Sequence, residues 1–331
     1  MDAISVDKLT KYYDDFLAVD QISFKVQQGE FFGLLGPNGA GKTTTIRTLT
    51  GLLKPTSGNL RVMGTDVTTN PVGVKRQIGV ISESASPYLE MSAWNNLMFA
   101  GSLHELSKSE REMQAENLLK LLGIYDRRHE KVEHFSKGLR KRVTIAIALI
   151  HEPPLLFLDE PTVGLDVQSA RMIRGVLRRL NEEGTTIFLT THYIEEADTL
   201  CDRIGIIKKG KLVAIAPPEE LKATNNQEKV VEVSFDIHSA AIEEKVSHVP
   251  TVVKTEKRGD KLRLYTHNTS TAVKDVCQFA KEEGLEIVYI QTLSPTLEDA
   301  FVKLTGFSSL DLERMERIGQ SRKKKMQMTG G

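Results

Sequence analysis

The strongest constraint on this chain is a glycine-rich loop that stands between an apolar segment and a helical pattern. Residues 30–35, EFFGLL, form a short apolar run that predicts a buried strand. GPNGAGKTT follows at once over residues 36–44, and Ile46, Leu49 and Leu53 then recur on one face of a predicted helix. A strand, a glycine-rich loop and a helix in this order are typical of a phosphate-binding loop rather than of a chance glycine-rich turn.

The residues of this loop suit a nucleotide phosphate. Glycines let successive backbone N–H groups point inward at phosphate oxygens, and the start of the following helix adds the positive end of its dipole. We expect Lys42 to reach the β- and γ-phosphates and Thr43 to offer its hydroxyl to a magnesium ion. The predicted phosphate-binding residues are Gly36, Pro37, Asn38, Gly39, Ala40, Gly41, Lys42, Thr43 and Thr44. The loop alone leaves open which kind of nucleotidase this is.

An acidic pair after a second apolar run supplies the rest of a catalytic site. Residues 155–159, LLFLD, predict a strand whose end carries Asp159 and then Glu160, and ligands gather at such ends in an open α/β sheet. Asp159 suits the magnesium shell, and Glu160 suits the polarising of an attacking water, whereas an ordinary surface turn is the competing interpretation. A third predicted strand, over residues 185–191, ends at His192. A lone histidine there is more often structural, but its place beside the other two strand ends favours a role in the site.

A basic stretch before the acidic pair has three interpretations. Residues 134–142, HFSKGLRKR, open a predicted helix and could be a nucleic-acid patch, a solvated helix face or a phosphate-binding helix entrance. The chain carries 44 Lys and Arg against 44 Asp and Glu, so no net positive field gathers nucleic acid. Ser136 and the N–H of Gly138 would offer donors to a phosphate that arrives at the helix N-terminus. We therefore favour the helix entrance and expect no nucleic-acid partner.

These motifs, in this order, resemble those of the ATPase subunits of ATP-binding cassette (ABC) transporters, and the resemblance covers at least residues 4–217. Residues 135–139 stand where that family has its Leu-Ser-Gly-Gly-Gln signature. The resemblance implies a subunit that binds ATP and Mg²⁺, hydrolyses ATP, forms a homodimer on ATP and drives a separately encoded transmembrane permease. The signature departs from the family pattern at Lys137, Leu139 and Arg140, and similar variants occur in the exporter branch that resembles daunorubicin and multidrug-resistance ATP-binding proteins.

Further site residues follow from the same resemblance, position by position. Tyr13 matches the aromatic residue that stacks on adenine, with a sheet-packing tyrosine as the alternative. Asp166 matches the loop that links the two ATP sites of the dimer, and His192 matches the histidine that contacts the γ-phosphate. Ser136 and Gly138 match residues that cap the γ-phosphate held by the other subunit.

Glu83 stands where most members of the family have glutamine. Glu83 and Glu160 could each take the proton of the attacking water, and Glu83 joins Thr43 and Asp159 as a candidate around the magnesium ion. Glu160 follows the magnesium aspartate at a rigid strand end, whereas Glu83 lies in a loop that is expected to move when the membrane subunit docks. We therefore expect Glu160 to be the general base.

Two other classes of protein fit parts of the pattern. A cassette ATPase that acts on DNA or ribosomes usually carries paired cassettes or long coiled-coil insertions, and this chain shows neither. A regulatory module that binds nucleotide without hydrolysing it would not need the intact pair Asp159 and Glu160.

The expected fold is α/β, a nucleotide-loop cassette ATPase with a mixed sheet and a helical insertion, followed by a small C-terminal α+β domain of the ferredoxin-like type. We place the cassette at residues 1–216, with the helical insertion at about 88–145, and a linker at 217–228. Residues 229–306 show the predicted order β-α-β-β-α-β of the accessory domain, and residues 307–331 form a basic tail. For the accessory domain we favour dimer support or packing over ligand sensing. For the tail we favour disorder over contact with anionic lipids.

Four side chains are expected in the core, and the chain is expected to reach the membrane only through a partner. We predict that Trp94 and Met98 lie in the core rather than on a docking surface. Cys201 and Cys277 are predicted to be small core residues of a protein from a reducing compartment. There is no signal-peptide pattern, and no apolar run approaches the ~20 residues that span a bilayer. The resemblance therefore implies a cytoplasmic protein at the inner face of the cell membrane. The transported substrate is not encoded here, because selectivity resides in the permease.

Overall fold

The computed structural model of the protein describes residues 1–223, 229–293 and 296–307. These residues form two compact units, Met1–Pro218 and Glu219–Gly306. Residues 224–228 of the predicted linker and residues 308–331 of the predicted tail lie outside the described residues. None of the helices in the described part of the chain combines the length and the apolar composition that crossing a bilayer requires.

A six-stranded sheet forms the centre of the first unit, in the order β10-β9-β3-β8-β7-β6. Its strands are β3 (Phe31–Leu35), β6 (Ile78–Ile81), β7 (Leu155–Asp159), β8 (Thr186–Thr191), β9 (Arg203–Lys208) and β10 (Lys211–Ala216). Only β10 runs antiparallel to its neighbour within this sheet. Every residue of β3, β7 and β8 is buried, as expected for strands covered on both faces. Because these three strands are parallel, their carboxyl ends meet at one edge of the sheet.

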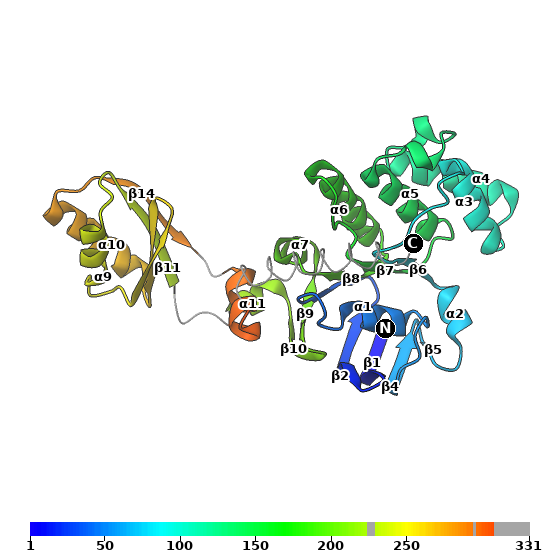
Figure 1. Cartoon of the computed structure of the whole chain (residues 1–331), viewed down its shortest axis with the longest axis horizontal. Coiled ribbons are helices and arrows are strands. Elements are labelled where there is room, and N and C mark those ends of the chain that lie inside the picture. The colour runs from blue at the N-terminus through cyan, green and yellow to red at the C-terminus, as the bar shows by residue number, and fades with distance from the viewer. Residues whose placement is uncertain (224–228, 294–295, 308–331) are drawn as a thin grey trace. The chain divides into compact units, whose positions relative to one another are not determined.

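A second, antiparallel sheet in the order β2-β1-β4-β5 shares one hydrophobic core with the first. Its strands are β1 (Asp2–Tyr13), β2 (Phe16–Gln27), β4 (Ser57–Val62) and β5 (Thr65–Asp66). The rings of Phe24, Phe32 and Phe188 stack across this core with centroids 5.5–5.9 Å apart. Helix α1 (Lys42–Leu49) contributes Ile46 and Leu49 to the same core, and Figure 1 shows it between the two sheets.

Helices form the remaining layer of the first unit (Figure 1). They are α2 (Pro71–Lys75), α3 (Ala93–Leu103), α4 (Lys108–Leu121), α5 (Lys137–Leu149), α6 (Val167–Glu182) and α7 (Ile194–Leu200), with short 3₁₀ turns at Tyr125–Arg127 and Val132–His134. The helices α3, α4 and α5 start at serine N-caps, which satisfy backbone N–H groups of the first turn: Ser92, Ser107 and Ser136. Ser107 also forms a capping box with Glu110.

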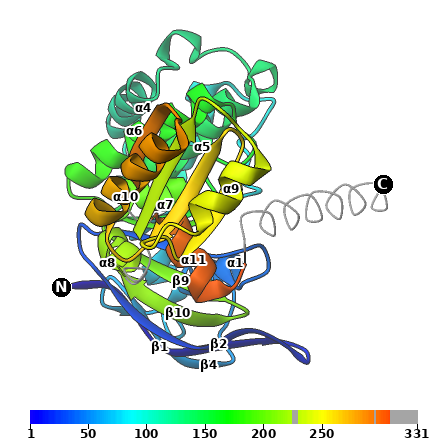
Figure 2. The same ribbon diagram turned by 90° about the vertical axis from the view of Figure 1, so that its left-hand side faces the viewer.

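The second unit is an antiparallel sheet in the order β12-β13-β11-β14, with helices on one face. Its elements are α8 (Pro218–Ala223), β11 (Lys229–Phe235), α9 (Ala240–Ser247), β12 (Lys254–Arg258), β13 (Lys261–Thr266), α10 (Thr269–Glu283), β14 (Ile287–Leu293) and α11 (Leu297–Thr305). Val231 and Val233 of the sheet pack against Val246 of α9 and Val276 of α10, and Figure 2 shows both helices over the sheet. The order β-α-β-β-α-β and the strand order confirm the predicted ferredoxin-like fold.

The expected core positions need two corrections. Trp94 and Met98 are only half-buried, because the buried face of α3 runs through Ala93, Leu97 and Ala100 and the two residues lie on its flank. Cys277 is exposed, whereas Cys201 is buried as expected. Cys277 directly follows the core residue Val276 on α10, and one step along a helix turns a side chain away from the core.

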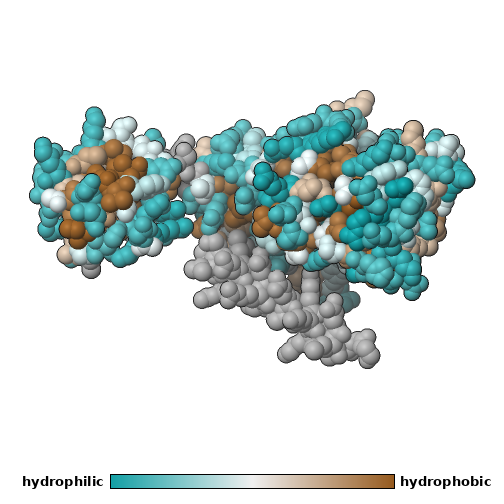
Figure 3. Space-filling model, turned by 90° about the horizontal axis from the view of Figure 1, so that it is seen from above, coloured by the Kyte–Doolittle hydropathy of each residue, from teal (hydrophilic) through white to brown (hydrophobic). Residues whose placement is uncertain are grey.

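Hydrophilic side chains cover most of the first unit's face seen in Figure 3, with small apolar patches between them. Large apolar side chains that are exposed on the helical layer gather near the start and end of α3. They are Tyr88, Leu89, Phe99, Leu103 and Met113.

Candidate functional site

The phosphate loop joins the end of β3 to the start of α1, and two of its glycines are required by close backbone contacts. A Cβ atom on Gly36 would lie 2.4 Å from the carbonyl oxygen of Ile207, and one on Gly41 would lie 2.7 Å from that of Ala18. Gly41 also has a φ of 109°, which L-residues rarely adopt, and it is the N-cap of α1. The sequence therefore places backbone N–H groups and a helix N-terminus around one point.

Lys42 is the first residue of α1, and its ammonium group joins the loop to the acidic pair. Its Nζ lies 2.6 Å from the carbonyl oxygen of Gly36 and 3.1 Å from Oε1 of Glu160. The side chain is only 5% exposed, so this cation is held away from solvent. Two motifs that lie far apart in the sequence thus meet at one lysine.

Asp159 ends β7 and is 2% exposed. Its Oδ1 accepts hydrogen bonds from the hydroxyl of Thr190 at 2.6 Å and from that of Thr43 at 3.2 Å. Burial raises the pKa of this carboxyl, although both hydroxyl groups oppose the rise. One carboxylate beside one hydroxyl suits Mg²⁺, a hard cation that usually binds one or two protein oxygens and completes its shell with waters and substrate phosphates.

Glu160 adopts a left-handed backbone conformation with a φ of 51°, which is unusual for a residue other than glycine. Its N–H donates to the carbonyl oxygen of Thr190 at 3.0 Å, and its Oε2 lies 2.8 Å from Nδ1 of His192 in an ion-pair contact. Burial favours the neutral carboxyl, but His192 and Lys42 outweigh it, so the pKa of Glu160 is lowered. The structure therefore holds Glu160 ionised, as a proton acceptor needs to be.

These groups line a pocket of about 460 Å³ at the carboxyl edge of the sheet. Tyr13, at the end of β1, is 40% exposed and lies in its wall, as do Glu83, Glu160 and His192. Phe16, at the start of β2, is 65% exposed in the same wall, and sequence reasoning missed it. Its signal is an aromatic residue directly after two aspartates and three positions beyond the candidate Tyr13. The lining from the phosphate loop and α1 is Asn38, Gly39, Gly41, Lys42, Thr43 and Thr44.

Ser136, Gly138 and Asp166 do not line this pocket. The hydroxyl of Ser136 caps α5 by accepting from the N–H of Leu139, and the carboxylate of Asp166 caps α6 by accepting from the N–H and hydroxyl of Ser169. Gly138 is packed so closely on Ser169 that a Cβ atom would lie 2.3 Å from its hydroxyl oxygen. These three residues form a second cluster at the starts of α5 and α6.

The arginines of the basic stretch bind backbone carbonyl groups of their own unit. Arg140 donates to the carbonyl oxygens of Phe135 and Glu133, and Arg142 donates to that of Leu122. All three cations from Arg140 to Arg142 are half-buried. This arrangement differs from the solvated, outward cations that bind a nucleic-acid backbone.

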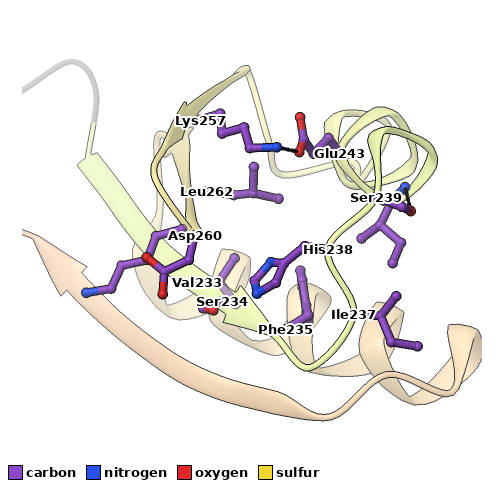
Figure 4. A pocket seen from close by; sticks show the side chains of 12 residues that line it. Val233, Ser234, Phe235, Ile237, His238, Ser239, Glu243, Lys257, Asp260 and Leu262 are labelled. Carbon is purple, nitrogen blue, oxygen red and sulfur yellow. Dashed lines mark hydrogen bonds and ion pairs between the residues drawn. The ribbon is translucent and has the colours of Figure 1, made fainter.

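The second unit has a pocket of a different kind, at the junction of β11, α9 and the turn between β12 and β13 (Figure 4). Lys257 and Glu243 form an ion pair above it, and His238 and Asp260 lie at its rim. Its volume is about 10 Å³, which is close to the space that one water molecule needs. The pocket has no room for a nucleotide or a drug-sized molecule.

The sequence pattern of the ABC transporter family matches residues 19–163. The linearmycin resistance ATP-binding protein of Bacillus subtilis (strain 168) is 35% identical over 306 residues, which cover 92% of this chain and 98% of that protein. The daunorubicin/doxorubicin resistance ATP-binding protein of Streptomyces peucetius is 34% identical, with 93% and 94% covered. The Nod factor export ATP-binding protein I of Paraburkholderia xenovorans (strain LB400) is 34% identical, with 92% and 97% covered.

Solved structures resemble the first unit. An ATP-binding subunit of an ABC transporter superposes with a TM-score of 0.62 at 30% identity, covering 67% of this chain and 93% of the other. A dimeric ATP-binding cassette, in a post-hydrolysis state bound to ADP and Pi, superposes with a TM-score of 0.60 at 26% identity, covering 65% and 98%.

Proposed function

The chain belongs to the ABC transporter family, as an ATP-binding subunit with ATPase activity, and from this premise we propose how its residues divide the work. Tyr13 stacks on adenine, with Phe16 beside it in the same wall. Lys42 gives up its contacts with Gly36 and Glu160 and binds the β- and γ-phosphates. The observation that carries the proposal is the meeting of Lys42, Asp159, Glu160 and His192 at one edge of the sheet.

Mg²⁺ would be held by Thr43 and Asp159, with Glu83 close to its water shell, and when bound it neutralises charge on the phosphates. Glu160 takes a proton from a water molecule as the water oxygen forms its bond to the γ-phosphorus. The bond from that phosphorus to the β–γ bridging oxygen breaks, and ADP leaves with the electron pair. His192 orients Glu160 through Nδ1 and presents the other edge of its ring to the γ-phosphate.

We infer a homodimer from the position of the second cluster. Ser136, Gly138 and Asp166 do not line the nucleotide pocket of their own chain, yet two of them lie at helix N-termini that suit an anion. A two-fold axis would bring this cluster to the pocket of the second copy and build two equal sites. Each ATP would then be bound by the loop of one copy and capped by the other.

We propose that a separately encoded permease docks on the helical layer beside Glu83 and places the subunit at the inner face of the cell membrane. The exposed residues Tyr88, Leu89 and Phe99 lie on that layer, and apolar side chains grouped in this way mark interaction surfaces. ATP closes the dimer, hydrolysis reopens it, and the motion passes through the loop of Glu83 to the permease. The resistance and export proteins among the relatives support the direction of transport, which we propose is outward.

Co-purification tests the proposal. Tagged protein extracted from membranes in mild detergent should bring down a polytopic membrane protein, and the pair should hydrolyse ATP faster than the subunit alone. A Phe99→Ser variant should lose the membrane partner and keep its basal hydrolysis, with Val213→Ser, equally exposed on β10 at the other edge of the sheet, as the matched control. Recovery of the chain without any membrane protein, under conditions that preserve known complexes, would contradict the assignment.

A further inference from the structure

A second pocket adjoins the nucleotide pocket and has a basic wall. It has a volume of about 200 Å³, and it shares Glu83, Glu160 and Val163 with the nucleotide pocket. We call it the basic pocket, after the α5 residues Lys137, Arg140 and Lys141 that line it. One water molecule needs about 10–15 Å³ of such space, so the pocket has room for a small polyatomic anion with several waters.

The basic wall is a consequence of helix geometry. Residues 137, 140, 141 and 144 are spaced at i, i+3, i+4 and i+7, so they form one stripe along α5, and all four line the pocket. The same spacing turns Arg142 away, toward the carbonyl oxygen of Leu122. Only part of the basic stretch in the sequence therefore faces this pocket.

The three cations differ in how they are already bound. Lys137 donates to the carbonyl oxygen of Val163, and Arg140 donates to two backbone carbonyl oxygens. Lys141 makes no hydrogen bond and no ion pair with any residue in the described part of the chain. It is half-buried, and burial lowers its pKa to about 8, although the carboxylates of Asp159 and Glu83 favour its charged form. Burial has removed much of the hydration of Lys141, and no hydrogen bond replaces it. Of the three cations, Lys141 would therefore be stabilised most by a bound anion.

The chemistry of the adjoining site supplies such an anion. In an in-line displacement the attacking oxygen and the leaving oxygen lie on opposite sides of the phosphorus, so the new phosphate forms on the side of the general base and away from ADP. Glu160 is the proposed base and is also part of the wall between the two pockets. The phosphate is then repelled by ADP and by the carboxylates of Glu160 and Glu83, whereas the cations that line the basic pocket all come from α5.

We propose that the basic pocket is a binding site for the inorganic phosphate released by hydrolysis, and that Lys141 is its main ligand. The inference rests on the proposed roles of Glu160 and the nucleotide pocket. It gives the basic stretch a role within its own subunit, separate from the helix entrance at Ser136 that faces the partner. Phosphate bound there delays reopening of the site until it leaves.

The test compares Lys141→Met, which removes the charge and keeps much of the length, with Lys141→Arg, which keeps the charge. Inhibition of steady-state hydrolysis by added inorganic phosphate is measured for each, together with KM for ATP. We expect Lys141→Met to raise the inhibition constant for phosphate about tenfold, the loss of one charge-assisted contact, while KM for ATP changes less than about twofold. Lys141→Arg should stay within about threefold of the wild-type constant. Arg171→Met, which removes an exposed cation of α6 outside both pockets, is the matched control and should change nothing.

Three results would overturn the proposal. One is an unchanged inhibition constant in Lys141→Met. Another is a rise in KM for ATP as large as the rise in the inhibition constant for phosphate, which would place Lys141 in the binding site of the γ-phosphate itself. The third is purely competitive inhibition of the wild-type protein by phosphate against ATP, which would rule out a separate site. We expect inhibition with a noncompetitive component instead. This measurement needs no variant, so it also applies if the Lys141→Met protein fails to fold.

Failure of the proposed function is distinguishable from failure of this inference. A wild-type protein that hydrolyses no ATP contradicts the proposed function and removes hydrolysis as the source of the phosphate, but it leaves the affinity of the basic pocket for phosphate to be tested. Binding of phosphate in the presence of ADP is then still measured, by broadening of the ³¹P resonance of inorganic phosphate. Broadening that Lys141→Met abolishes and Arg171→Met preserves supports the pocket, and broadening that all variants share overturns it.

Discussion

Two buried glutamates, one in each unit, have similar electrostatic surroundings and very different settings. Glu160 is 7% exposed between Lys42 and His192, and Glu232 is 8% exposed between Lys261 and Arg263 at 3.4 and 3.1 Å. Burial opposes ionisation of both, and the cations outweigh it, so both have a lowered pKa. A perturbed carboxyl is therefore no proof of a catalytic site.

The two glutamates differ in backbone conformation and in the open volume beside them. Glu232 lies within β11, in regular register between Arg263 of β13 and Gln291 of β14. Glu160 follows a strand end, has a left-handed backbone and borders a pocket of about 460 Å³. A cross-strand ion pair stabilises a sheet, whereas a residue with a left-handed backbone beside open volume is in a setting that functional sites often use. The comparison favours chemistry in the first unit, and dimer support remains our hypothesis for the second.

The largest expected effect comes from neutralising Glu160, and neutralising Glu232 is the control. Glu160→Gln should lower turnover by about 10²–10⁴-fold, the usual scale for loss of a general base, because the amide cannot accept the proton. ATP should stay bound and favour a closed dimer. Glu232→Gln is the matched control and should leave turnover within about twofold, a barrier change of about 0.4 kcal/mol. Steady-state hydrolysis and ATP affinity check both, and a dead Glu232→Gln protein that is folded would break the comparison.

A smaller effect is expected at the other acid of the nucleotide pocket. Glu83→Gln restores the residue that is common in the family and should keep turnover within roughly tenfold, or about 1.4 kcal/mol in the barrier. Loss of one negative charge near the phosphates should tighten ATP binding slightly. The assay is the same steady-state hydrolysis, run beside Glu160→Gln. If Glu83→Gln is inactive and Glu160→Gln is active, the base has been assigned to the wrong residue.

A third perturbed site should affect stability and leave turnover alone. The rings of His104 and His151 stack 3.6 Å apart, and burial, together with the charge of His104, lowers the pKa of His151 to about 4. The unfolded chain takes up a proton near pH 6.5 that the folded chain refuses, so stability is lost as pH falls from about 6.5 toward 4. The melting temperature should drop between pH 7 and pH 5 by a few degrees in the wild type and by less in His151→Phe, which keeps the stack. Equal drops in both proteins would show that another group is responsible.

The smallest effect is expected from removal of the second unit. A chain that ends at Ala216 retains the whole nucleotide pocket and should bind ATP within about twofold of the full chain, a difference of about 0.4 kcal/mol. Its dimerisation and its coupling to the permease are expected to suffer, because support of the dimer is the role we assign to the unit. Equilibrium binding of a fluorescent ATP analogue to both chains is the measurement. A folded truncation without affinity for ATP would mean that the second unit completes the site.

The sequence predicts the fold wherever local pattern and tertiary environment agree. The apolar runs before Gly36 and at residues 155–159 are buried strands, because no polar residue interrupts them and both faces are covered. The order β-α-β-β-α-β was readable because alternation and helical spacing changed cleanly between segments. The roles of the individual site residues stay predictions that the experiments above address.

Other features depend on contacts that no local pattern encodes. The half-burial of Trp94 depends on which face of α3 meets α5, and an amphipathic pattern gives that face only to within one residue. The left-handed backbone of Glu160 arises where the chain leaves β7 and its N–H binds Thr190 of β8. The basic pocket could not be predicted from residues 134–142, because composition gives the number of charges but not the direction in which the side chains point.

The left-handed backbone of Glu160 has a consequence for the directed evolution of thermostable variants of this protein. A left-handed conformation costs an ordinary residue about 1 kcal/mol or more, and glycine escapes that cost. Glycine at this position would therefore remove the backbone strain, but it would also leave the buried ammonium of Lys42 without its carboxylate partner, which is destabilising. The backbone strain and the buried ion pair at this one position act on stability in opposite directions, so selection for stability alone does not consistently favour replacement of the glutamate.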